Sequence, residues 1–363
     1  MNKKFLKYSL SVIIIMGISL FISINKIHKN SSANEYAKNT EKTKASVASK
    51  DSNLESSLMT LEGTYFTPCL NKDGNKILYS SGDDIYEIDL IKNNVKQLTN
   101  LGNCYNPVYY EKDNNIIAFA RNDGIYLINI TENSIKKIIS SKEPNISFAK
   151  PNFMPNGDLI YFKTKLISKE DERGFIEENP SINMISKDGK NDMKITEGYN
   201  PVLFKDGKTL VYEMGENLYL MNLQTKDKKL IDSGKYASFS NDGKYISYTK
   251  YEKETVPYAN IKEKKNLFVD KEYSNVFIVE TNNTKNKFKL TKEEFENKDK
   301  EIEEWAKQTN NLKTEQHFLI VSKIAYFDTL WSKDNKSLYI SIYNSSKGYF
   351  ELIKVQVPDL LAR

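Results

Sequence analysis

One pattern recurs along most of this chain, and an internal repeat constrains the fold more than any other sequence feature. Each copy has an aromatic residue, usually a proline, a turn pair about five residues later, and then three apolar segments. In the first copy these are Pro68, the turn pair Asp73-Gly74, and segments with Ile77, Ile85-Tyr86 and Leu98-Thr99. Further copies begin near residues 105, 148, 199, 236 and 327. The sequence therefore predicts six similar units.

Each copy has the local features of an antiparallel sheet. Asp-Gly and Asn-Gly pairs between apolar segments supply the positive φ angles that a tight hairpin needs. A proline before the first segment is tolerated because the first residue of a strand need not donate to the ladder. Four-stranded units of about 35–50 residues cannot bury both faces alone, so they stack around an axis. We therefore expect an all-β fold, a six-bladed β-propeller of four-stranded antiparallel blades; two all-β domains are the alternative.

The two ends of the repeat region indicate how the propeller closes. The sixth copy holds only three strands, whereas residues 58–63 match the fourth-strand ending at 97–102. We therefore expect the N-terminal strand to complete the last blade, which removes exposed sheet edges. Six blades result, or seven if the long fifth copy hides another.

The repeat resembles that of the TolB-like propellers. The resemblance rests on Pro68, Asp73-Gly74, the segment 85–89 and Gln97-Leu98-Thr99, and it extends over roughly residues 58–357. It implies the propeller fold, but such propellers are scaffolds in many unrelated proteins. TolB proteins also carry an α/β domain before the propeller, whereas only a short tether precedes it here. The family's role with a lipoprotein partner is therefore not expected.

Net charge is unevenly distributed. The chain has 53 Lys+Arg and 48 Asp+Glu, a formal +5. Residues 1–50 hold nine lysines and two acids, a net +7, so the remainder carries −2. A near-neutral body is not typical of a nucleic-acid-binding domain, so we expect no nucleic-acid partner.

The N-terminal residues have the pattern of an export signal. Lysines precede the apolar run 8–24, which is long for a cleaved signal and short for a membrane span. We expect residues 1–30 to form a signal-anchor or signal peptide, 31–56 a disordered tether, and 57–358 the propeller. The lysines favour a single-pass protein of the cell membrane with its body outside; secretion after cleavage is the alternative.

Three insertions, 163–181, 250–275 and 292–325, are expected on one propeller face. Elaborated loops on a rigid scaffold often carry function, so this face is the candidate binding surface, although insertions can also be neutral drift. An aromatic residue precedes each first strand there and could contact a ligand at the channel mouth or pack between blades. These residues are Phe66, Tyr105, Phe148, Tyr199, Tyr236 and Phe327.

The last insertion contains a predicted helix over residues 293–316. Phe295, Ile302 and Trp305 fall on one face of it, and acidic residues cover the rest. We expect this helix to lie over the propeller with Trp305 buried; a partner-binding helix is the alternative.

Signals for catalysis, metals and disulfides are weak. No Gly-x-Ser-x-Gly motif is present, and only His317 could serve a catalytic triad, since His28 flanks the apolar run. We expect no metal and no cofactor. Cys69 and Cys104 flank the first strands of adjacent blades, and export would permit a bridge between them, although free thiols are the simpler expectation.

The sequence therefore favours a non-catalytic binding or scaffold module for a protein, peptide or cell-wall polymer at the cell envelope, acting as a monomer. The alternative is a propeller enzyme, either a glycan hydrolase or lyase or a peptidase-associated domain, with its site in the channel mouth. Titratable groups that converge at the channel would favour the enzyme.

Overall fold

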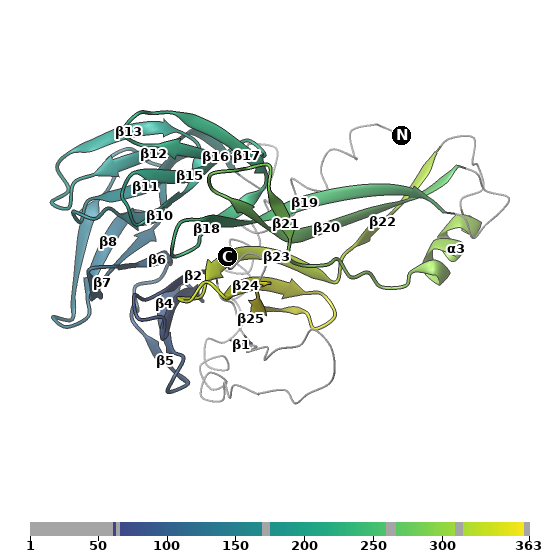
Figure 1. Ribbon diagram of the computed structural model, residues 1–363, viewed down its shortest axis with the longest axis horizontal. Coiled ribbons are helices and arrows are strands. Elements are labelled where there is room, and N and C mark those ends of the chain that lie inside the picture. Colours follow the sequence, from purple (N-terminus) through teal and green to yellow (C-terminus); the bar gives the residue numbers. More distant parts are fainter. Residues whose placement is uncertain (1–60, 63–65, 169–174, 259–265, 309–314, 359–363) are drawn as a thin grey trace.

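The computed structural model describes residues 61–62, 66–168, 175–258, 266–308 and 315–358 (Figure 1). Its fold is all-β, with six four-stranded antiparallel sheets, one of which has an additional strand. Sheets one to three consist of β2 (Phe66–Leu70), β3 (Lys76–Ser81), β4 (Asp84–Asp89) and β5 (Asn94–Gln97); β6 (Cys104–Tyr110), β7 (Asp113–Arg121), β8 (Gly124–Asn129) and β9 (Ser134–Ile139); and β10 (Ile146–Phe153), β11 (Leu159–Ser168), β12 (Phe175–Ile185) and β13 (Asp192–Glu197).

The remaining sheets follow in chain order. Sheets four to six consist of β14 (Tyr199–Leu203), β15 (Thr209–Met214), β16 (Asn217–Asn222) and β17 (Lys228–Ser233); β18 (Lys235–Phe239), β19 (Tyr245–Pro257), β20 (Leu267–Glu280) and β21 (Lys287–Lys289); and β23 (Ile324–Trp331), β24 (Ser337–Asn344), β25 (Tyr349–Gln356) and β1 (Leu61–Glu62). The additional strand is β22 (Gln316–Val321), which pairs with β20 in parallel.

The first strands of successive sheets contact one another, and β23 of sheet six also contacts β2 of sheet one. We call this set of six sheets the sheet body. Ile77 and Tyr79 of sheet one share a core cluster with Tyr339 and Leu352 of sheet six, and Leu61 of β1 is in register with Leu352. The two ends of the repeat region therefore lie together.

The Asp-Gly turns also help to pack one sheet on the next. Gly207 has a φ of +70°, and a Cβ added to it would lie 2.5 Å from Pro155 of the preceding sheet. Gly243 has a φ of +73°, with Phe204 of the preceding sheet equally close, at 2.6 Å. Glycine is thus required at these turns both by the backbone angle and by the neighbouring sheet.

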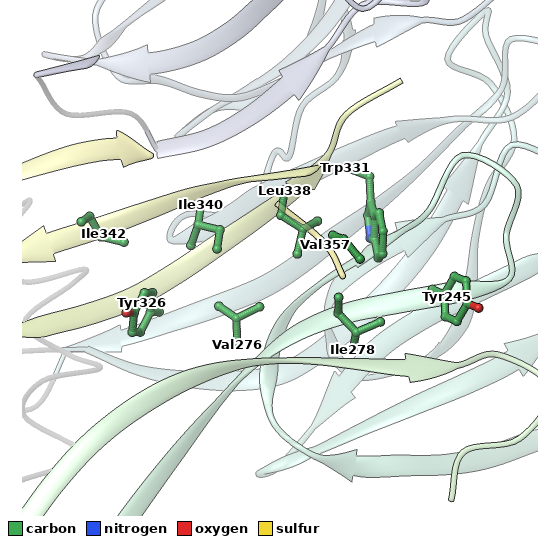
Figure 2. Close-up of a cluster of buried hydrophobic side chains, with 9 residues drawn as sticks. All are labelled: Tyr245, Val276, Ile278, Tyr326, Trp331, Leu338, Ile340, Ile342 and Val357. Carbon is green, nitrogen blue, oxygen red and sulfur yellow. The ribbon is translucent and has the colours of Figure 1, made fainter. Parts of the chain in front are cut away.

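The core lies between neighbouring sheets, where the middle strands are buried on both faces. Figure 2 shows the cluster between sheets five and six, in which Val276 and Ile278 of β20 face Leu338 and Ile340 of β24. The Trp331 ring stacks on Tyr245 of the other sheet with 6.2 Å between ring centroids. Residues from strands with alternating apolar side chains therefore hold the sheets together without any helix.

Sheet five extends into an arm that projects from the sheet body (Figure 1). We define the arm as the outer parts of β19 and β20, strand β22, and helix α3 (Asp299–Gln308). It has its own buried cluster of Leu267, Val269, Ile302 and Ala306. The arm is therefore a small, separately packed unit.

Two predictions about the last insertion are wrong. The helix begins at Asp299, not at 293, and it packs on the strands of the arm rather than over the sheets. Residues 316–321 form a strand, because β20 provides a partner edge that local periodicity does not indicate. Within the described residues, no helix has the length and apolar character needed to cross a membrane. The apolar run 8–24 lies outside that part of the chain.

Candidate functional site

A bulge interrupts the first strand of every sheet near its start. In five sheets the bulged residue has a positive φ of 46–56°, a conformation that is uncommon for residues other than glycine. These residues are Thr67, Asn106, Lys150, Asn200 and Tyr236. In sheet six the corresponding irregularity lies between Tyr326 and Thr329.

The bulges are held by polar side chains. The Lys150 N–H donates to Asn106 Oδ1 at 3.0 Å, and the Asn106 N–H donates to Ser80 Oγ at 3.2 Å. The Tyr236 N–H likewise donates to Glu213 Oε1 at 3.0 Å. In each case the acceptor comes from the preceding sheet, so these bonds fix the bulges at the junctions between sheets.

An ion pair joins two bulges that are distant in the chain. Lys150 Nζ of sheet three lies 3.2 Å from Asp328 Oδ1 of sheet six. Two sheets separate these partners in either direction along the series of contacts between first strands. Their side chains are only 22% and 15% exposed. The pair therefore connects opposite sides of the sheet body.

Glu213 is a buried carboxyl group close to this pair. It is 4% exposed, and its Oε2 accepts a hydrogen bond from Asn200 Nδ2 at 3.0 Å. Burial raises the pKa of Glu213, because its hydrogen bonds and the nearby charges of Lys235 and Lys150 only partly offset the loss of water. A carboxyl group of this kind can exchange protons closer to neutral pH than a solvated glutamate.

Two tyrosines complete the group. Burial raises the pKa of Tyr236 and of Tyr251 well above the usual tyrosine value, and the charges of Asp328 and Glu213 act in the same direction. Their hydroxyls interact with each other and stay protonated, so they can serve as hydrogen-bond donors. We call Lys150, Asn200, Glu213, Tyr236, Tyr251 and Asp328 the central cluster.

The predicted aromatic ring is not a set of equivalent positions. Phe66, Tyr105 and Tyr199 lie one residue before their bulged residues, Tyr236 is itself a bulged residue, and Phe148 lies two residues before its own. Most of the described rings pack between sheets. The Tyr105 hydroxyl donates to the Phe148 carbonyl at 2.9 Å, and Phe148 is buried.

The other predicted aromatic residues have protein neighbours too. The Tyr199 ring lies 5.4 Å from that of Phe162, and the Tyr236 ring lies 6.0 Å from that of Phe327. The side chain of Phe66 lies outside the described residues. Of the six predicted positions, Tyr236 is the one that the structure brings into the central cluster.

The predicted partner-binding residues of the insertion belong to the arm. Ile302 is buried, and the Trp305 ring meets Phe318 of β22 edge-on at 5.5 Å. Phe295 precedes the helix and meets Tyr273 edge-on at 5.8 Å. His317 also lies on the arm, where its Nδ1 is 3.1 Å from Asp270 Oδ1. These residues are therefore remote in sequence and in packing from the central cluster.

Both cysteines are free thiols. Burial raises the pKa of Cys69 and of Cys104 to about 11, which keeps the thiols protonated and unreactive at neutral pH. The disulfide that export would permit is thus not formed. Among the described residues, no group of three or more His, Cys, Asp or Glu is arranged to hold a metal ion.

Sequence reasoning missed most of the central cluster. Lys150 and Asn200 stand directly before prolines, as do Thr67 and Asn106. That position was a usable signal, because a residue before proline lacks a following N–H donor and a bulge can form there. The contact of Lys150 with Asp328, by contrast, depends on the assembled sheets and has no local signal.

Comparisons with known proteins bear on the fold. No protein-family model and no curated protein sequence matches the chain. Similar solved structures include a gluconolactonase from Xanthomonas campestris (TM-score 0.53, 10% identity, 86% of this chain and 98% of that chain covered). A luciferin-regenerating enzyme (0.54, 8%, 83% and 95%) and TolB from Acinetobacter baumannii (0.42, 14%, 79% and 62%) are also similar.

These findings confirm one prediction and overturn another. The resemblance to TolB-like propellers is confirmed by the six four-stranded antiparallel sheets, and TolB is among the structural neighbours. The prediction of a non-catalytic binding or scaffold module is wrong, because the similar structures are mostly named as enzymes. The aromatic mouth expected for such a module is also replaced by a cluster of titratable groups.

Proposed function

We propose that this chain is a β-propeller enzyme whose active site is the central cluster. The observation that carries the proposal is the convergence of Glu213 with the Lys150–Asp328 pair at bulged strands from three different sheets. Strained bulges and buried titratable groups with perturbed pKa values are concentrated at functional sites in proteins. The two structural neighbours with TM-scores above 0.5, both named as enzymes, are consistent with this assignment.

The groups of the cluster suit proton transfer on a polar, sugar-derived substrate. Glu213, with its raised pKa, would act as the general acid or base. Lys150 would stabilise negative charge that develops on a substrate oxygen, and Asp328 would hold Lys150 in place. The tyrosine hydroxyls would bind substrate hydroxyls. Hydrolysis or elimination on a carbohydrate derivative needs only these elements.

For the architecture, we propose six blades closed into a ring, with β1 as the outer strand of the last blade. The pairing of β1 with β25 and the contact of β23 with β2 support this proposal. In a closed ring of six, blades three and six stand opposite each other, and the Lys150–Asp328 pair crosses the channel. A substrate would then meet the cluster as the floor of the channel mouth.

For localisation, we propose that the apolar run 8–24 anchors the chain in the cell membrane with the enzyme body outside, as a monomer. The lysines before the run support this orientation. Substrates would then be carbohydrates of the cell envelope or its surroundings.

The test uses the purified full-length chain and a panel of sugar lactones, acetylated sugars and uronic-acid oligosaccharides. Proton release and the ultraviolet absorbance of unsaturated sugars report hydrolysis and elimination. Substituting Glu213→Gln keeps the size of the side chain and an acceptor for the Tyr236 N–H, and it should lower kcat at least ~100-fold.

The matched control is Asp123→Asn, which changes a carboxylate paired with Lys137 in the β7–β8 turn. It should leave kcat unchanged. Turnover by Glu213→Gln equal to that of the unaltered chain would remove the central cluster as the active site. Failure of the unaltered chain to act on any member of the panel would overturn the proposed enzyme class.

A further inference from the structure

Strand β22 is an edge strand of the arm. The amides of Gln316 and Ser322 donate to carbonyls on the β20 side of β22, at Asn266 and Glu272, both at 2.9 Å. Backbone groups alternate in direction along a strand, so Phe318 and Ile320 also face β20. His317, Leu319 and Val321 therefore direct their N–H and C=O groups to the other edge. Among the described residues, no strand pairs with β22 on that side.

The end of β22 shows that this outer edge can bond to a backbone. The Lys323 N–H has the same parity as Leu319 and Val321, and it donates to the Glu294 carbonyl at 2.7 Å. Before that point, the edge and the segment leading into α3 diverge and leave a groove of about 360 Å³. Its floor is residues 318–321, and its far wall includes Glu296, Lys298 and Glu301.

The side chains and charges of the groove define what fits it. Leu319 and Val321 are 44% and 48% exposed, so apolar surface accompanies the unpaired backbone groups. An exposed apolar edge is a template for another extended chain. The segment 292–308, which forms the far side, has seven acidic residues and four lysines, a net −3. A partner strand is therefore favoured if it is basic.

We propose that the outer edge of β22 binds an extended, lysine-rich peptide segment of a partner protein, which adds a strand to the arm. Its apolar residues, at every second position, would cover Leu319 and Val321. Its lysines would face the acidic side of the groove. This site is separate from the central cluster and does not depend on the proposed enzyme activity.

The experiment measures fluorescence anisotropy of labelled peptides with the full-length chain in detergent. The probes are a nonapeptide of alternating lysine and valine and one of alternating glutamate and valine. Leu319→Pro removes one outward N–H, and proline is tolerated on an edge strand where its N–H position faces outward. We expect it to weaken binding of the lysine peptide about tenfold or more, and the glutamate peptide to bind far more weakly to the unaltered chain.

Leu319→Ala is the matched control, because it shortens the side chain and keeps the N–H. It should weaken binding only about two- to threefold, and melting curves should show both variants folded. An equal loss in both variants would overturn strand addition, and equal affinity for the two peptides would overturn the basic partner. Dimerisation of the chain in analytical ultracentrifugation, abolished by Leu319→Pro, would instead assign the edge to a second copy.

Discussion

The sheet body and the arm solve the problem of burial in different ways. In the sheet body, each sheet is covered on both faces by neighbours built from the same repeat, as between β20 and β24. In the arm, one helix covers one face of three strands, and the cluster around Ile302 has no counterpart elsewhere in the described chain. Residues of the sheet body are thus supported from two sides, and those of the arm from one.

This difference explains where each kind of candidate site lies. The central cluster needs precise positions, and the sheet body fixes them through hydrogen bonds between successive sheets, such as Tyr236 to Glu213. The arm instead leaves a strand edge open beside a groove. A rigid body suits chemistry, whereas an open edge suits recognition of a flexible partner.

The largest expected effect is on stability and separates the two cores. Ile340 is fully buried between sheets five and six, so Ile340→Ala should lower the free energy of unfolding by about 2–5 kcal/mol. Ile302 is equally apolar and 2% exposed, but it belongs to the arm. Ile302→Ala should loosen the arm and leave unfolding of the sheet body nearly unchanged. Denaturant unfolding with hydrogen exchange of the arm amides measures both effects.

A loss of global stability in Ile302→Ala as large as that in Ile340→Ala would show that the arm and the sheet body unfold as one unit. Ile340→Val is the control, since it removes a single methyl group and should cost only about 0.5–1.5 kcal/mol.

The repeat explains why the sheet body was predictable. Turn pairs such as Asp73-Gly74 and the apolar segments between them are local signals, and they recur six times. The arm was not predictable to the same degree. β22 becomes a strand because β20 extends beyond its sheet and provides an edge, and that contact joins residues about fifty positions apart. Helix α3 had a correct periodic signal, but its packing surface is this same arm.

The candidate site was predicted only at Tyr236. The expectation of an aromatic ring followed the type of residue, whereas the structure selects by register, and a shift of one position in a strand reverses the side chain. The tyrosine at 105 therefore packs between sheets, and the asparagine next to it forms the bulge. Glu213 was missed because its neighbours Asn200 and Tyr236 come from different strands.

A second prediction compares ion pairs of the two regions. The Lys150–Asp328 pair is mostly shielded from solvent, and Lys150→Met would leave Asp328 without its partner. We expect a loss of about 1–3 kcal/mol in the free energy of unfolding, below the value for a fully buried pair. In the arm, Lys271 and Glu254 are 3.8 Å apart, and the Glu254 side chain is 52% exposed. Lys271→Met should change stability by less than about 1 kcal/mol.

A double-mutant cycle of Lys150→Met with Asp328→Asn isolates the interaction from other effects of each change. A coupling energy of zero would mean that the pair does not hold the two sides of the sheet body together. The same variants in the carbohydrate assay would then show whether Lys150 contributes to turnover without contributing to stability.

The smallest expected effect concerns pH, and the two regions should respond in opposite directions. Burial raises the pKa of Glu213, so the folded state binds this proton more tightly than the unfolded state does. Stability contributed by this group is therefore present below the unfolded pKa of about 4.3 and decreases as the pH rises toward the folded value. Relative to the unaltered chain, Glu213→Gln should become more stable as the pH rises from 4 to 7.

Asp270 of the arm has the opposite shift. Burial alone would raise its pKa, but hydrogen bonds from Thr255, His317 and Lys253 together outweigh burial and lower it. Its contribution is therefore present above the unfolded pKa of about 3.9 and is lost as the pH falls through the lower folded value. Relative to Asp270→Asn, the unaltered arm should lose hydrogen-exchange protection below pH 4. Parallel pH profiles for the two variants would show that burial does not distinguish the two carboxyl groups, and that the difference between a body covered on two sides and an arm covered on one has no electrostatic consequence.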